Sequence, residues 1–154
     1  MTRTKNSLEL THEFAASRAR VFEAWTRKEQ MGWFSPIEMR VTAAEGDVKV
    51  GGNFRMSMKG EDGKVHTCYG TYEEIVPNER LVFTHQWEGE NPVETLVTVE
   101  FEDKAGDTEV TLQQEGFVDP EEAKGHEEGW MSAFEHLDAQ LTKASSSAGW
   151  ESSR

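Results

Sequence analysis

Residues 116–141 read GFVDPEEAKGHEEGWMSAFEHLDAQL, and this stretch decides the fold. Asp119 can cap the N-terminus of a helix, Pro120 suits the first helical position, and the two glutamates that follow suit the positive end of the helix dipole. Apolar residues then recur at spacings of three, four and seven, at Ala123, Trp130, Ala133, Phe134, Leu137 and Leu141. We therefore predict a long amphipathic helix whose wide apolar face needs a broad apolar surface to lie on.

The chain before this helix supplies such a surface in the form of strands. Apolar and polar residues alternate in the segments Ser7–Phe14, 39–44, 54–59, Val65–Val76, 81–87, 97–101 and 108–115. This period of two is typical of half-buried strands. Short turns at 45–47, 60–63, 77–78 and 105–107 separate consecutive segments, so the sheet should be an antiparallel meander. Gly70 predicts a bulge within its strand.

Two short helices are expected between the first two strands. Ser17 can cap the first helix, whose apolar positions are Val21, Phe22, Ala24 and Trp25, and a second helical turn at 28–31 runs into Gly32. An apolar loop follows at 33–37. This order predicts one α+β domain over residues 7–142, in which a curved antiparallel sheet of six to seven strands wraps around the C-terminal helix. Residues 1–6 and 143–154 are expected to be flexible tails.

The composition excludes several classes of partner. The chain has 154 residues and a formal net charge of −13, whereas phosphate binding needs clustered Lys and Arg, so we expect neither a nucleic acid nor an anionic membrane surface as partner. No segment approaches the ~20 apolar residues of a membrane span, and the N-terminus lacks the apolar run of a signal peptide. Cys68 is the single cysteine, which excludes an internal disulfide and is typical of a cytoplasmic protein.

Five short motifs occur in a characteristic order. They are Arg18-x-x-Val21-Phe22-x-Ala24-Trp25-Thr26, Val50-Gly51-Gly52-x-Phe54, residues 70–84 with the pattern G-x-Y-x-x-I-x-P-x-x-R-L-V-F-T, Thr108-x-Val110-Thr111-Leu112, and Gly129-Trp130. Together they resemble the activator-of-heat-shock-protein-90-ATPase-like family, within the helix-grip superfamily of START domains and the birch-pollen allergen. The resemblance covers residues 7–142.

The resemblance implies a helix-grip fold with a cavity between the long helix and the concave face of the sheet. Members of this superfamily bind or transform varied apolar ligands, so the fold alone does not assign a function. The eukaryotic co-chaperones of this name carry an additional N-terminal domain that grips the chaperone. Because that domain is not in this sequence, we do not expect chaperone activation.

The candidate cavity lining is rich in aromatic residues and methionine, which suit an adaptable apolar site. It comprises Trp25, Trp33, Phe34, Met56, Met58, Phe83, Trp87, Trp130 and Phe134, and core packing is the alternative for each. His66, Cys68 and His85 complete the set and lie on neighbouring segments. They are compatible with a polar strand face, a hydrogen-bonding anchor, a Cys–His nucleophile or a soft-metal site. Their spacing carries no recognised metal signature, so we expect no metal and no cofactor.

The long helix carries a further histidine pattern. His126-Glu127-Glu128-Gly129-Trp130 begins like a zinc-protease motif, but Trp130 stands where the second histidine ligand belongs. His126 and His136 lie ten residues apart, on nearly opposite sides of a helix, so they do not form a joint site. One of the two is left to point into a pocket.

Three functions are compatible with this sequence. We rank first a non-enzymatic protein that binds a small, mostly apolar molecule, aromatic or lipid-like, whose polar end is oriented by His66, His85 or Tyr69. The second is an enzyme of the cyclase, aromatase or hydrolase type, which needs a cavity group with a perturbed pKa and a partner. The third is a protein-interaction module or a homodimer that exposes an apolar patch at the 33–37 loop.

Overall fold

The computed structural model of the chain describes residues 7–34, 40–89 and 93–151, without the side chains at 28, 29, 32 and 143–151. In chain order the elements are β1 (Ser7–Phe14), α1 (Arg18–Thr26), the 3-10 helix η1 (Lys28–Phe34), β2 (Arg40–Gly46), β3 (Asn53–Lys59), β4 (Val65–Val76), β5 (Arg80–Trp87), β6 (Thr95–Lys104), β7 (Asp107–Glu115) and α2 (Pro120–Glu151). This is the α+β helix-grip architecture that the sequence predicts.

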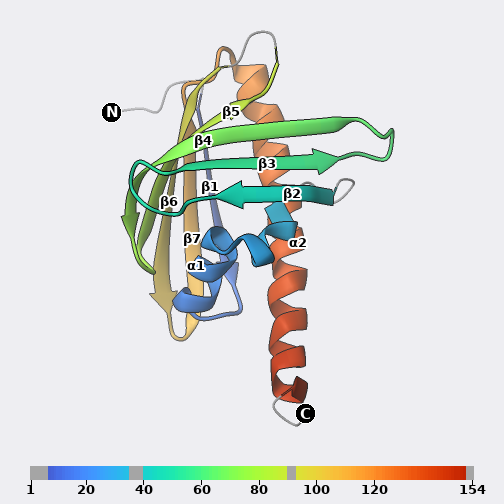
Figure 1. Ribbon diagram of the computed structural model, residues 1–154. Helices are drawn as coiled ribbons and strands as arrows, with labels where there is room; N and C mark the ends of the chain where they lie inside the picture. The colour runs from blue at the N-terminus through green and yellow to red at the C-terminus, as the bar shows by residue number, and fades with distance from the viewer. Residues whose placement is uncertain (1–6, 35–39, 90–92, 152–154) are drawn as a thin grey trace.

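The strands form one antiparallel sheet in the order β1-β7-β6-β5-β4-β3-β2. The predicted meander is confirmed from β2 to β7. The first strand joins the last, because Ser7 lies opposite Glu115 and Phe14 opposite Thr108. Figure 1 shows the strong twist of this sheet: β1, β6 and β7 run along α2, whereas β2, β3 and β4 cross it. The sheet therefore encloses one face of the helix.

The start of α2 is capped as its sequence predicts. The Glu122 backbone N–H donates to Asp119 Oδ1 at 2.8 Å, and the Glu122 carboxylate accepts from the Val118 N–H at 3.4 Å. The whole predicted apolar stripe, from Ala123 to Leu141, is buried. The helix continues to Glu151, beyond its predicted end at Leu141, since no proline or glycine interrupts residues 142–148.

Three local predictions differ from the structure. The turn expected at 45–47 comes later, because β2 extends to Gly46 and the chain reverses near Gly51, which has a φ of 87°. The second helix is a 3-10 helix that includes Trp33 and Phe34, both buried, so these residues do not belong to an exposed apolar loop. The rest of that loop, 35–37, lies outside the described residues.

The expected bulge at Gly70 is the third difference. The register shift of β4 lies between Tyr72 and Glu74 instead. A Cβ atom at Gly70 would stand 1.8 Å from the backbone oxygen of Thr84 on β5. Gly70 is therefore required because the two strands approach closely, and not because it forms a bulge.

Hydrogen bonds hold the short helices against the long one. Ser17 caps α1 by accepting from the Arg20 N–H at 3.3 Å, as predicted, and Arg20 Nη2 donates to the Leu141 carbonyl at 3.2 Å. Gln140 Nε2 donates to the Gln30 carbonyl at 2.8 Å. The indole N–H of Trp33 donates to the Ala24 carbonyl at 2.8 Å, which fixes η1 on α1. These bonds close the lower end of the core.

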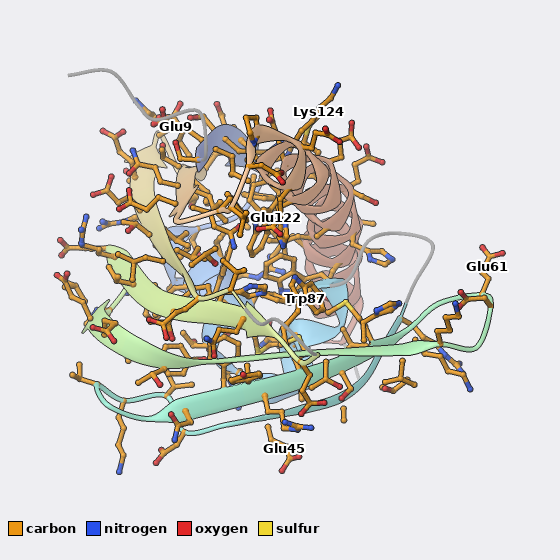
Figure 2. All side chains as sticks on the ribbon, turned by 90° about the horizontal axis from the view of Figure 1, so that it is seen from above. Glu9, Glu45, Glu61, Trp87, Glu122 and Lys124 are labelled. Atoms are coloured by element: carbon orange, nitrogen blue, oxygen red, sulfur yellow. The ribbon has the colours of Figure 1, made fainter. Side chains whose placement is uncertain are left out.

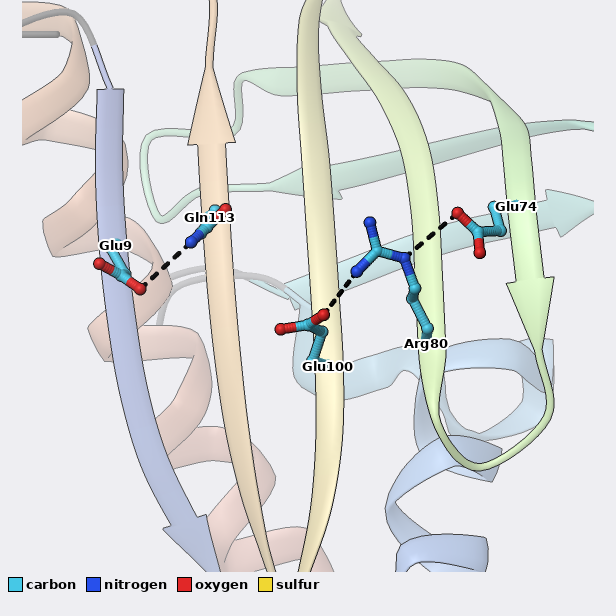
Figure 3. A network of polar contacts seen from close by, with 5 residues as sticks. All are labelled: Glu9, Glu74, Arg80, Glu100 and Gln113. Carbon is cyan, nitrogen blue, oxygen red and sulfur yellow. Dashed lines mark hydrogen bonds and ion pairs between the residues drawn. The ribbon is translucent and has the colours of Figure 1, made fainter. Parts of the chain in front are cut away.

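The outer face of the sheet is polar. Figure 3 shows Arg80 between Glu74 and Glu100 across three neighbouring strands, and Gln113 donating to Glu9 at 3.2 Å. Exposed pairs of this kind contribute little to stability, so they mark which face meets water rather than what holds the fold together. In the part of the chain that the structure describes, no helix is both long and apolar enough to cross a membrane.

Candidate functional site

A cavity of about 460 Å³ lies between the first half of α2 and strands β3 to β5. The sheet contributes Met58, His66, His85 and Trp87, η1 contributes Phe34, and the helix contributes Glu122, Gly125, His126, Gly129, Trp130 and Ala133. Gly125 and His66 are exposed and mark the opening to solvent. In Figure 2 Trp87 lies in the space between the strands and the helix, with Glu122 on the helix side.

A row of small residues on α2 makes room for this cavity. Gly125, Gly129 and Ala133 are four residues apart and therefore share one face of the helix. A Cβ atom added at Gly125 or Gly129 would meet no heavy atom within 4 Å. Each glycine inside a helix lowers its stability by roughly 1 kcal/mol relative to alanine. This face of the helix is therefore less stable than one with larger residues, but it leaves volume open.

His85 is the most deeply buried polar side chain of the lining, with only 4% of its surface exposed. Burial, and to a smaller extent the neighbouring His126, lowers the pKa of His85 from 6.5 to about 3. The imidazole is thus neutral at physiological pH, with one N–H donor and one nitrogen acceptor. Its centroid lies 5.4 Å from the Trp87 ring and 6.2 Å from the His126 ring, both in edge-to-face contact.

His126 joins the sheet to the helix across the wall of the cavity. Trp87 Nε1 donates to His126 Nε2 at 2.9 Å, and His126 Nδ1 lies 2.9 Å from the Glu122 carbonyl oxygen. An indole N–H can only donate, so Nε2 must be the acceptor and the proton must sit on Nδ1, which donates to Glu122. Both ring nitrogens of His126 are therefore occupied, and the tautomer is fixed by its partners.

A buried chain of hydrogen bonds supports the same wall from behind. Trp130 Nε1 donates to Gln114 Oε1 at 2.7 Å, Gln114 Nε2 donates to Thr95 Oγ1 at 2.8 Å, and Thr95 Oγ1 donates to the His85 carbonyl at 2.9 Å. Gln114 is fully buried. The chain fixes the Trp130 indole and the backbone of His85 relative to each other, so two sides of the cavity are positioned together.

A protein-family model described as Activator of Hsp90 ATPase homolog 1-like protein matches residues 15–142. The chain belongs to this family. The assignment confirms the resemblance that the sequence motifs indicate. The wider fold family commonly binds hydrophobic ligands. A comparison with curated proteins finds no match.

Solved structures of bacterial proteins share the fold over nearly the whole chain. A solution structure of a protein from Arthrobacter aurescens has a TM-score of 0.81 and 27% identity, covering 90% of this chain and 87% of that one. A crystal structure of a protein from Chromobacterium violaceum has a TM-score of 0.79 and 25% identity, covering 88% and 96%. The AHSA1 protein of Silicibacter pomeroyi has a TM-score of 0.79 and 24% identity, covering 90% and 99%.

The structure divides the residues proposed from sequence into two groups. Six line the cavity, namely Phe34, Met58, His66, His85, Trp87 and Trp130. The other six are buried in the core and are not among the residues that line this cavity, namely Trp25, Trp33, Met56, Cys68, Phe83 and Phe134. Among the rings of the second group, Trp25 lies 4.7 Å from Trp33 and 6.2 Å from Phe134, centroid to centroid.

Two polar proposals from the sequence also change. Burial raises the pKa of the Cys68 thiol to about 12, which keeps the thiol neutral and disfavours the Cys–His nucleophile that the sequence also allows. Tyr69 points to the opposite face of β4 from Cys68, away from the cavity, because its neighbours in register are Arg55 and Gln86. Within the described ranges, no three His, Cys, Asp or Glu side chains are grouped so as to hold a metal ion.

Sequence reasoning missed the small residues of the helix, the role of His126 and the buried Gln114. The spacing of Gly125, Gly129 and Ala133 is a usable signal, because three small residues on one face of an otherwise bulky helix leave a gap. The alternation of β7 places Gln114 on the same face as Val110 and Leu112, so its burial is also a usable signal. Its role as the acceptor for Trp130 becomes apparent only in the structure.

Proposed function

We propose that this protein binds a small, mostly apolar molecule in the cavity between α2 and β3–β5. The observation that supports this most strongly is an open volume of about 460 Å³ whose lining is mainly aromatic and aliphatic, with one buried unpaired imidazole. Ligand sites typically measure ~300–1,000 Å³ and combine an apolar wall with a few polar groups. The hydrophobic-ligand binding that is common in the fold family supports the same assignment.

The binding energy would come mainly from the apolar wall. Phe34, Trp87 and Trp130 offer ring surfaces, and Met58 adds an adaptable side chain. Burial of about 200 Å² of the ligand's apolar surface would contribute roughly 5 kcal/mol to the free energy of binding, at ~25 cal/mol per Å². The wall is rigid where Trp130 is held by Gln114, so little side-chain ordering would oppose binding there.

An enzymatic role is the second candidate, and it rests on the same histidine. His85 has the perturbed pKa that a catalytic group requires, but the shift is downward, which makes it a weak base at neutral pH. Among the described residues no carboxylate or hydroxyl hydrogen-bonds its ring to orient it.

A protein-interaction role is less supported, because Trp33 and Phe34 are buried. We also propose a cytoplasmic location, which the single free cysteine supports.

Native mass spectrometry of the protein purified from its own host tests the proposal. We expect a stoichiometric apolar compound that is released on denaturation, and its return to the empty protein should change the tryptophan fluorescence. An empty protein that also fails to bind apolar probes in titration would contradict the proposal. Release of two related compounds, one formed from the other by the protein, would favour the enzyme.

A cavity-filling variant provides the matched comparison. Gly129→Leu places a side chain in open space and removes a helix glycine, so the fold should be at least as stable while affinity falls by ten-fold or more. Ala139→Leu adds a similar side chain on the exposed face of the same helix and should leave binding unchanged. Equal affinities of the two variants would place the ligand elsewhere.

A further inference from the structure

Among the buried side chains of the lining, the hydrogen-bonding capacity is almost fully used within the protein, and His85 is the exception. The indole N–H groups of Trp87 and Trp130 donate to His126 and Gln114, and both nitrogens of His126 are occupied. For the His85 ring, no hydrogen bond occurs to any described residue.

The His85 ring nitrogens also reach open space. Among the described residues, Trp25 Nε1 is the only buried side-chain nitrogen or oxygen that lacks both a partner and contact with open volume. His85 is 4% exposed and lines the cavity, so its unpaired nitrogens are directed into it. A neutral imidazole left unpaired in apolar surroundings is unfavourable, and a ligand that pairs with it recovers the lost interaction.

The charge of the lining is the second observation. The titratable groups of the wall are His66, His85, Glu122 and His126, and none of the described residues that line it is Lys or Arg. A carboxylate or phosphate entering the cavity would meet the Glu122 carboxylate and a neutral imidazole. The chain as a whole carries −13, which opposes an anion further. Burying an anion without a cationic partner is strongly unfavourable.

We infer that the cavity accepts an uncharged molecule with one hydroxyl group, a phenol or an alcohol on a ring skeleton, and that His85 recognises this hydroxyl. The inference rests on the proposed function and specifies its ligand class. A hydroxyl group both donates and accepts a hydrogen bond, as does a neutral imidazole. The lowered pKa of His85 keeps the imidazole in this neutral form at physiological pH.

Four probes of one shape test the inference by isothermal titration calorimetry at pH 7. They are naphthalene, 2-naphthol, 2-naphthoate and 2-naphthylmethylammonium. We expect 2-naphthol to bind about ten-fold more tightly than naphthalene, which is the effect of one net hydrogen bond, and both ions to bind more weakly than naphthalene. Tighter binding of either ion, or equal binding of naphthol and naphthalene, would overturn the inference. If none of the four probes binds, including naphthalene, both this inference and the proposed function are contradicted.

Two substitutions assign the effect to His85. His85→Phe should bring the affinity for 2-naphthol to within about two-fold of the affinity for naphthalene, both measured on the same variant. His85→Gln keeps a donor and an acceptor and should keep most of the preference. A preference that survives in His85→Phe would contradict the assignment.

NMR spectroscopy of the wild-type protein provides a test that does not require His85→Phe to fold. In the wild-type protein, 2-naphthol should shift the imidazole ¹⁵N resonances of His85, identified by their absence in His85→Gln. Naphthalene should leave them nearly in place. Unchanged His85 resonances on saturation with naphthol would exclude the contact.

Discussion

Two parts of the helix α2 face the same sheet, but the space between helix and sheet is filled beside one part and open beside the other. Around Phe134, the helix meets Phe14 at 5.4 Å and Trp25 at 6.2 Å between ring centroids, and the rings fill the space between the layers. Around Gly129, small helix residues share the lining with bulky side chains such as Trp87, and about 460 Å³ stays open. The number of aromatic residues therefore does not decide whether a helix-grip interior is packed or hollow. The size of the helix residues that border the interior contributes as well.

The largest test of this contrast compares one tryptophan from each region. Trp25→Ala removes a ring that is 1% exposed and packed by other rings, and should lower the free energy of unfolding by about 3–5 kcal/mol. Trp87→Ala removes a half-buried ring that borders open volume, and should cost about 1–2 kcal/mol. Urea denaturation measures both. Similar costs would mean that the cavity region is packed as tightly as the core.

Removing the buried hydrogen-bond chain should have the next largest effect. Gln114→Leu leaves Trp130 Nε1 without its acceptor and Thr95 without its donor, and should destabilise the protein by about 3 kcal/mol. Gln113→Leu, one residue along on the outer face, should change stability by less than about 0.5 kcal/mol. Thermal unfolding of the two variants checks the difference. A cost for Gln114→Leu as small as that of its neighbour would contradict the role of the chain.

The third test uses the pH dependence of stability. The pKa of His85 is about 3 in the folded protein against 6.5 without burial, so the unfolded chain takes up a proton first. The contribution of His85 to the free energy of unfolding is therefore fully present above about pH 6.5 and is lost as the pH falls towards about 3. Between pH 7 and pH 5 the loss should be about 2 kcal/mol.

His85→Phe is the reference for this measurement, because it removes the titrating group and keeps a ring in its place. Denaturant midpoints of both proteins at pH 7, 6 and 5 separate the effect of His85 from that of other groups. Parallel pH profiles for the two proteins would show that His85 is not buried in a neutral form.

The smallest effect concerns the helix itself. Gly129→Ala should raise the free energy of unfolding by about 0.5–1 kcal/mol, because the added methyl group meets open space and alanine favours the helix. Ala139→Gly, on the exposed side of α2, should lower it by a similar amount. Differential scanning calorimetry resolves both shifts. A destabilising Gly129→Ala would indicate that the volume beside it is occupied.

The sequence predicts the fold well because the relevant patterns are local. The cap at Asp119 and the stripe from Ala123 to Leu141 depend on residues within a few turns of each other, and strand alternation depends on nearest neighbours. The role of Gly70 could not be recognised in this way, because it depends on the approach of Thr84 from another strand.

The candidate site is predicted only in part for the same reason. Trp25 and Trp87 look alike in the sequence, and their environments differ because different helix residues lie opposite them. His85 could be proposed from its place among apolar residues of one strand. The hydrogen-bonding roles of His126 and Gln114 could not, since each side chain acquires its role from a tryptophan that is distant along the chain.

The pairing of β1 with β7 has a consequence for how the chain folds. Ser7 of β1 pairs with Glu115 of β7, and the Arg20 side chain of α1 donates a hydrogen bond to the Leu141 carbonyl of α2. The first elements of the chain therefore depend on the last ones. Contacts between such distant segments close large loops and slow folding. During synthesis, the N-terminal strand must wait until nearly the whole domain has left the ribosome. The meander from β2 to β7 can form meanwhile, and arrival of the final helix then completes the sheet edge and the cavity together.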